Sequence, residues 1–295
     1  MASEPKSAAV PRLLWWCRQK GWRHLVLWVG VLFALFPVVW ILSASINAQD
    51  NLASARLIPR QRTLSNFKEL FENDLTPFML WLRNSWVVSL VAASLNVLIA
   101  AMAAYAFARF RFRGRRLGLL TLLLVQVFPQ FLGFIALLLL LISMGNVFAP
   151  IGIDTLAGLI LVYLGGAIGF NAFLIKGFMD SVPMSLDESA MIDGATPATV
   201  FWWIMVPLIR PVLAVIFVIT FIGVYSEFLL AQTLLRSTDN FTYAIGLRLF
   251  AQSDYTAKWG QLAAAAVIGA FPIVVSFLVA QRQIIGGLTR GSVKG

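Results

Sequence analysis

The chain has 295 residues, of which 60% are hydrophobic and only 12% are charged. The surface of a water-soluble domain needs more charge than this, so the composition excludes an ordinary soluble protein and indicates an integral membrane protein. The formal charge of +10 gathers beside apolar stretches, as it does in membrane proteins, and we expect no nucleic-acid partner.

Six apolar stretches are long enough to cross a bilayer. Each offers about 20 mostly apolar residues, which is the length that a helix needs to span the hydrocarbon core. Backbone polar groups in lipid must be paired within the segment, and the stretches lack the alternation of barrel strands, so helices are expected. The predicted fold class is an all-α integral membrane protein of about six transmembrane helices, near Leu25–Ile46, Trp86–Phe107, Leu117–Ile142, Leu156–Ile175, Leu208–Val224 and Leu262–Ala280.

Basic residues set the expected orientation. They precede the first stretch and fill the link between the second and third stretches: Lys6, Arg12, Arg18, Lys20, Arg23, Arg109, Arg111, Arg113, Arg115 and Arg116. Cations resist translocation, so both regions and both termini are expected in the cytoplasm. The predicted organisation is a cytoplasmic lead (1–24), a transmembrane domain (25–282) and a cytoplasmic tail (283–295).

The first stretch could also be a cleaved signal peptide. Its apolar core exceeds the roughly 7–15 residues usual in such peptides, so a retained helix is favoured, whereas cleavage would leave five spans. Inside the third and sixth stretches, Pro129 and Pro272 predict kinks, because proline removes a helix hydrogen bond.

Groups that could drive or catalyse a reaction are scarce. The sequence contains no G-x-x-x-x-G-K-[ST] phosphate loop, so we do not expect this chain to hydrolyse ATP by that route. Arg210 and Glu227 lie near span ends, where long side chains can snorkel to the interface. The single His24 and single Cys17 suggest no metal site, internal disulfide or nucleophile–base pair, so neither enzyme activity nor a cofactor is expected.

Neutral polar residues occupy the middle of the stretches. In membrane bundles such residues most often form hydrogen bonds between helices, and we favour this interpretation over contact with a solute. The residues are Asn96, Gln126, Gln130, Asn171 and Thr220.

A short helix is predicted between the fourth and fifth spans. Ser185 followed by Glu188 is a capping-box pattern, in which each side chain satisfies a free backbone N–H. Gly194 can adopt the left-handed conformation that ends a helix. Thr196-Pro197 can begin the next helix, with threonine as N-cap and proline in the first turn.

The acidic residues of this helix favour a docking role. It carries no cation, whereas a helix lying on a membrane surface usually presents Lys or Arg to anionic lipid. A basic groove on a partner protein therefore suits it better than lipid or its own bundle, although these remain alternatives. The acidic side chains are Asp180, Asp187, Glu188 and Asp193, and the apolar contacts would come from Leu186, Ala190 and Met191 or Ile192.

This region resembles the EAA signature of ABC-importer permeases. The stretch Glu188-Ser-Ala-x-x-Asp193-Gly194-Ala-Thr-Pro197, followed by Ile204-x-x-Pro207, matches the family pattern E-A-A-x-x-x-G then I-x-L-P. It departs from the pattern where Ser189 replaces the first alanine and Val206 replaces leucine. The chain is most similar to the MalG type of maltose and maltodextrin importers, also in Ala104–Arg109, Val162–Gly166 and Gly287–Gly295.

The resemblance implies the fold of a type I ABC importer permease, located in a bacterial cell membrane. The cytoplasmic coupling helix, about 185–194, would dock on an ATP-hydrolysing subunit dimer. A second, MalF-like permease, an extracytoplasmic sugar-binding protein and membrane lipid would be the other partners. The cargo would be an oligosaccharide such as maltose, maltodextrin or trehalose.

The resemblance also implies site residues, although none for sugar contact. The ATPase-docking residues would be Asp187, Glu188, Ser189, Ala190, Asp193, Gly194, Ala195 and Pro207. The tail contacting the ATPase would contain Ser292, Val293, Lys294 and Gly295. The loop facing the binding protein would contain Leu247, Arg248, Gln252 and Gln261.

A different class of protein is the alternative. A polytopic facilitator or assembly factor outside the ABC family could use the acidic loop for other docking. Secondary carriers often show an internal inverted repeat and a midplane charge, and we see neither in this sequence.

Overall fold

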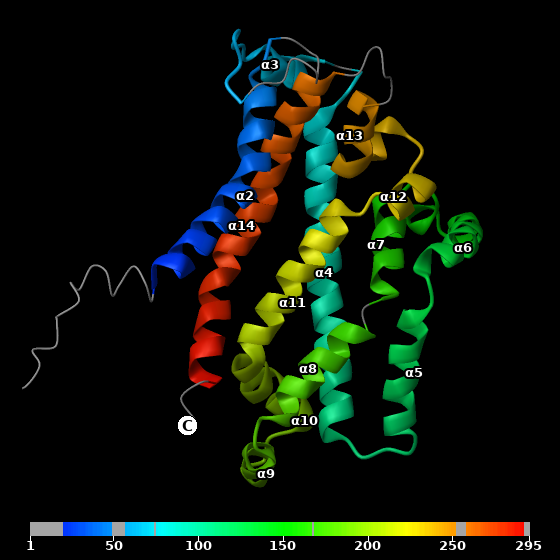
Figure 1. Cartoon of the computed structure of the whole chain (residues 1–295). Coiled ribbons are helices and arrows are strands. Elements are labelled where there is room, and N and C mark those ends of the chain that lie inside the picture. Colours follow the sequence, from blue (N-terminus) through cyan, green and yellow to red (C-terminus); the bar gives the residue numbers. More distant parts are fainter. Residues whose placement is uncertain (1–19, 49–56, 74, 167, 252–257, 292–295) are drawn as a thin grey trace, which may run out of the picture.

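The long helices of the chain run side by side between two ends of the molecule (Figure 1). The computed structural model describes residues 20–48, 57–73, 75–166, 168–251 and 258–291. Within these ranges the only β-structure is an isolated bridge between Asn47 and Arg62. The long helices are α2 (Trp22–Ser45), α4 (Phe78–Arg109), α11 (Val206–Ser226) and α14 (Trp259–Gly291).

Four helical segments are long and apolar enough to span a membrane. They are Trp22–Ser45, Phe78–Arg109, Pro197–Ser226 and Trp259–Gln281, which correspond to the first, second, fifth and sixth predicted stretches. A bent pair of helices described next adds a fifth candidate if it counts as one span.

The third predicted stretch is not one straight helix. It divides into α5 (Arg115–Val127) and α6 (Phe134–Val147), with the 3-10 turn η3 (Gln130–Gly133) at the break, and the two parts are bent by 83°. Phe128 and Pro129 at this break have extended backbones. Pro129 therefore lies at the bend, as predicted, whereas Pro272 lies within the continuous helix α14.

The fourth predicted stretch is also divided, into α7 (Leu156–Leu164) and α8 (Phe170–Asp180). Glycines weaken helices, and Gly165, Gly166 and Gly169 lie between the two parts. Gln126 of α5 supplies partners for the interrupted backbone. Its side-chain oxygen accepts from the N–H of Phe170 at 3.0 Å, and its amide donates to Gly166 O at 3.4 Å.

Helix α4 forms the centre of the packing. Its small residues face α8 and α11 in a buried cluster and let the backbones approach closely: Ala100, Ala101, Ala104 and Ala108. Farther along, Asn171 of α8 donates to Asn96 Oδ1 of α4 at 2.9 Å and to Thr220 Oγ1 of α11 at 3.4 Å. The interhelical interpretation is thus confirmed for these residues and Gln126, while the side chain of Gln130 lies outside the described part.

Short helices lie at both ends of the bundle (Figure 1). One end carries α9 (Met184–Ile192) and α10 (Pro197–Thr199), followed by the π-helical segment η5 (Val200–Met205). The opposite end carries α3 (Ser65–Glu72) and α13 (Tyr243–Ala251). We call these the α9 end and the α13 end. The remaining short elements are η4 (Ala149–Ile151), α12 (Leu229–Leu234) and η6 (Thr238–Asn240).

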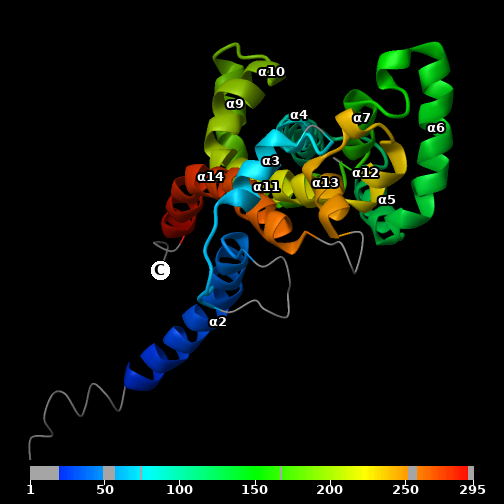
Figure 2. The ribbon, with the colours of Figure 1, turned by 90° about the horizontal axis from the view of Figure 1, so that it is seen from above.

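Large apolar surfaces stay open on the flanks. Viewed along the helices, α2 projects to one side, against α14, and α6 lies on another flank (Figure 2). The spanning window of α2 is not buried at all within the chain. These surfaces suit lipid or another membrane protein rather than water.

Candidate functional site

The two ends of helix α9 differ in how well the sequence predicts them. It begins after Pro183, one residue before the predicted start, so Ser185 lies inside the helix and no side chain caps its first turn. The predicted capping box is therefore wrong. At the other end, Gly194 adopts a left-handed backbone with φ of 90°, as predicted, and donates to Met191 O at 3.1 Å.

The next helix begins where the sequence predicts it. The Thr196 hydroxyl accepts from the N–H of Thr199 at 3.2 Å, and Pro197 occupies the first turn. Pro207 lies exposed in the first turn of α11. Helix α9 therefore ends in a well-defined turn that leads directly into α10.

One side of α9 exposes acidic and apolar groups together. Ile192 is 86% exposed, and Leu186 and Met191 are 43% and 46% exposed. Ala190 and Ala195 are instead partly buried against the cluster beside α4. We use the term α9 surface for the exposed residues Leu186, Glu188, Ser189, Met191, Ile192 and Asp193.

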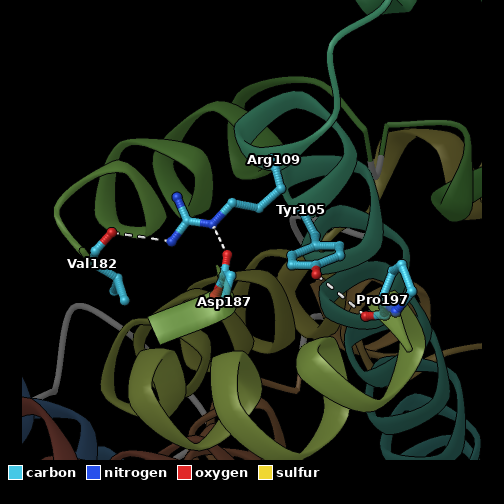
Figure 3. A network of polar contacts seen from close by, with 5 residues as sticks. All are labelled: Tyr105, Arg109, Val182, Asp187 and Pro197. Atoms are coloured by element: carbon cyan, nitrogen blue, oxygen red, sulfur yellow. Dashed lines mark hydrogen bonds and ion pairs between the residues drawn. The ribbon is translucent and has the colours of Figure 1, made fainter. Parts of the chain in front are cut away.

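Asp187 does not belong to the α9 surface. Its side chain is 2% exposed and forms an ion pair with Arg109, the last residue of α4, whose side chain is 7% exposed (Figure 3). The Arg109 Nη2 also donates to Val182 O at 3.1 Å. The prediction that Asp187 faces a partner is therefore wrong. Arg109 lies at the start of the predicted basic link, but its charge is paired within the protein. Successive helix residues are separated by about 100°, so Asp187 points inward while Glu188 points outward.

A second residue of α4 contacts the far side of the same segment. The Tyr105 hydroxyl donates to Pro197 O at 3.2 Å, and its ring lies 5.1 Å from the ring of Phe201. Residues four apart share one helix face, so Tyr105 and Arg109 act side by side (Figure 3). The last turn of α4 thus holds the chain before, within and after α9.

The acidic character of the α9 surface comes from two residues. Asp180 does not contribute, because it lies on α8 and its carboxylate is paired with Lys176 at 2.5 Å. Glu188 and Asp193 form no ion pair with other described residues. The α9 surface therefore offers two carboxylates beside exposed apolar side chains, a combination that can bind a basic groove with apolar walls.

Of the residues predicted to face a binding protein, one is exposed at the α13 end and two are partly or fully buried. Arg248 of α13 is exposed, whereas Leu247 is partly buried against a core cluster. Gln261 is 2% exposed and hydrogen-bonds to Glu69 of α3, so its predicted role at a surface is wrong. Gln252 lies outside the described residues.

Two further predictions concern chain ends and charges. The helix α14 continues to Gly291, so the predicted start of a tail at residue 283 is not a helix end. The predicted tail residues Ser292, Val293, Lys294 and Gly295 lie outside the described part. Glu227 accepts from the Tyr163 hydroxyl at 2.7 Å and from Leu230 N at 2.8 Å, so it faces the protein rather than the interface.

Sequence reasoning missed Arg109 and Tyr105 as parts of this site. Both lie in the stretch Ala104–Arg109, which carried part of the family resemblance but no assigned role. Their position four residues apart on one predicted helix face was the available signal.

Comparisons with known proteins find relatives along most of the chain. A family model described as the inner membrane component of binding-protein-dependent transport systems matches residues 96–285, which include α9 and Arg109. The chain is 38% identical over 283 residues to the maltose/maltodextrin permease MalG of Vibrio parahaemolyticus, covering 92% of this chain and 95% of the relative. It is 37% identical over 273 residues to the galactooligosaccharide permease GanQ of Bacillus subtilis, covering 92% and 94%.

A solved structure shows the same fold. It is a bacterial ABC transporter involved in importing the acidic polysaccharide alginate, with a TM-score of 0.72 and 22% sequence identity. The match covers 95% of this chain and 99% of that chain.

Proposed function

This chain belongs to the family of inner membrane components of binding-protein-dependent transport systems, and we propose that it is a permease subunit of an ABC importer for oligosaccharides. Its apolar helices fit a multi-pass membrane protein, and its relatives are permeases rather than enzymes. The energy for transport would come from ATP hydrolysis on partner subunits.

The observation that carries the docking proposal is the α9 surface. A short helix transmits force only if it moves without deforming, and α9 is followed by the Gly194 turn and attached to α4 through the Arg109–Asp187 ion pair. Its outer face places Glu188 and Asp193 among exposed apolar side chains, away from the spans. The glycine turn and the two partly buried alanines would set the position of this face. The other residues that we propose for the docking region are Ser189, Ala190, Gly194, Ala195 and Pro207.

The orientation proposal follows from charge at the same end of the molecule. Arg111, Arg113 and Arg116 are exposed in and after the link that follows α4. Cations favour the cytoplasmic side, so the α9 end faces the cytoplasm and the ATPase subunits. Both termini would be cytoplasmic, and α14 ends toward this side (Figure 1).

The other partners follow from the open surfaces. The exposed apolar faces of the bundle would contact a second, MalF-like permease and membrane lipid. The α13 end would face an extracytoplasmic sugar-binding protein, with Arg248 on its surface. An alginate transporter has been solved in complex with a pentasaccharide-bound periplasmic protein, and this chain matches it with a TM-score of 0.62.

We propose a neutral oligosaccharide as the cargo, with maltodextrins first and trehalose or another oligosaccharide next. The support is the 37–38% identity to permeases named for maltose, maltodextrin and galactooligosaccharides. The likeness to the alginate importer has 22% identity and concerns the fold alone.

Reconstitution tests this function directly. Vesicles containing the chain, its ATPase, a second permease and a binding protein should take up maltodextrin only when ATP is supplied. Glu188→Lys should remove the ATPase from the purified complex, because it places a cation where a basic groove is expected. Asp239→Lys, the same reversal of charge at an exposed acidic residue of the opposite end, is the matched control. Normal ATPase recovery and sugar uptake with Glu188→Lys would show that the docking proposal is wrong.

A further inference from the structure

We infer that Arg109 is a positioning residue that makes helix α4 move together with the docking helix α9. This inference rests on the proposed function and adds the route by which motion enters the bundle. The sequence connects α9 only to α8 on one side and to α10, η5 and α11 on the other. Arg109 adds a third helix.

The contacts of Arg109 bridge distant parts of the chain. Its guanidinium pairs with Asp187 within α9 and donates to Val182 O, which lies 73 residues away in the sequence and in the turn before α9. One turn earlier on α4, Tyr105 donates to Pro197 O after α9, across 92 residues. These three attachment points, one within α9 and one on each side of it, hold the segment on the last turn of α4, so we expect α4 and α9 to move as one unit.

Burial makes this attachment hard to break during a transport cycle. The two charged side chains are 7% and 2% exposed, so separating them would leave desolvated charges without partners. Apolar contacts between helices can slide by small steps, whereas a buried ion pair holds one register. The charged contact therefore fixes the position of α9 on α4 more closely than the surrounding alanines and Phe201 do.

The helix that receives this motion is the most buried of the candidate spans. Helix α4 runs from the α9 end to the α13 end and packs against α7, α8 and α11 (Figure 1). A displacement of α9 by a docked ATPase would thus reach the centre of the bundle directly. The Asn96–Asn171–Thr220 hydrogen bonds then connect α4 to α8 and α11 farther along.

A paired apolar replacement separates positioning from folding. Replacing both members of a buried ion pair by apolar residues of similar size is often neutral or stabilising, so Arg109→Met with Asp187→Leu should fold and insert. In vesicles with the full complex, we expect ATPase recovery near the wild-type level. The number of sugar molecules taken up per ATP hydrolysed should fall about tenfold, in the range of typical coupling energies between sites. Arg111→Met, at the exposed neighbouring cation, should leave this ratio unchanged.

A cross-link supplies the rescue. In a Cys17→Ser background, Arg109→Cys with Asp187→Cys should show the same loss, and a flexible bis-maleimide joining the two cysteines should restore the ratio to within about twofold. An unchanged ratio in the apolar double variant, or a cross-link that stops transport, would overturn this inference while leaving the docking proposal intact. Absence of the ATPase from the wild-type complex would instead overturn the proposed function, and this inference with it.

Discussion

Asp187 is buried and its neighbour Glu188 is exposed, so substitution of Asp187 should lower the stability of the chain, whereas substitution of Glu188 should lower its affinity for the ATPase. Asp187→Asn removes one charge from a buried pair and leaves the Arg109 guanidinium without compensation. Breaking a buried pair in this way costs about 3–5 kcal/mol, and asparagine can still accept one hydrogen bond, so we expect about 3 kcal/mol. For a chain of this size the melting temperature should fall by roughly 5 °C.

Glu188→Gln should leave the stability unchanged and weaken ATPase binding. Glu188 is exposed and forms no ion pair with the described residues, so the melting temperature should stay within about 2 °C of the wild type. In the proposed docked complex, loss of the Glu188 charge should weaken ATPase binding by about 30-fold or more, because a buried cation of the basic groove would lose its counter-charge.

The two effects are measured on the same purified samples. Thermal unfolding of the permease in detergent gives the stability, and titration with the ATPase gives the affinity. A normal melting temperature for Asp187→Asn, together with a large drop in the melting temperature for Glu188→Gln, would refute the assignment of inward and outward faces on α9.

Three further predictions follow from the geometry of single residues. Gly194→Ala should destabilise the turn after α9 by about 1–2 kcal/mol, because φ is 90° there, and should lower ATPase recovery in the pull-down. Gly246→Ala should lower the melting temperature, because its Cβ would lie 2.1 Å from Trp81 Cε3, and overpacking of this kind costs about 1–3 kcal/mol. Partial burial raises the pKa of Asp154, but hydrogen bonds from Ser237, from Arg236 N–H and from Asn240 lower that pKa on balance. The ionised carboxylate therefore stabilises the fold at pH values above its unfolded pKa of about 3.9, and this contribution is lost as the pH falls through the lowered folded pKa. Asp154→Asn should be less stable than the wild type at neutral pH. In unfolding measured from pH 7 to pH 2, the variant should also lack this acid-dependent loss of stability.

Features encoded locally could be predicted from the sequence. The apolar length of the α4 and α14 regions identified their spans, because the bilayer sets the length that a helix needs. Gly194 and Thr196 marked the end of α9 and the start of α10, since backbone conformation and capping depend on neighbouring residues.

Of the two breaks inside the predicted spans, the sequence predicted only the one at Pro129. Pro129 predicted a kink, but the bend of 83° depends on how α5 and α6 pack, which no single residue encodes. The glycines at 165, 166 and 169 were part of a stretch that was expected to be continuous. Their interruption is stable because Gln126, from another helix, pairs the free backbone groups.

Pairing between distant residues could not be predicted. Arg109 looked like one of several cations that set orientation, and Asp187 looked like one of several acids available to a partner. Each interpretation was reasonable for its own stretch of sequence. Only the packing of α4 against α9 shows that the two charges neutralise one another, leaving Glu188 and Asp193 as the acidic groups of the α9 surface.

The most direct test of the account asks which side of the membrane α9 faces and what covers it. Ile192 is 86% exposed on the α9 surface, and a single cysteine there, in a Cys17→Ser background, can be labelled with a membrane-impermeant maleimide. We predict labelling only from the cytoplasmic side of inverted vesicles, and protection when the ATPase is bound. Labelling from outside intact cells, or equal labelling with and without the ATPase, would contradict the account.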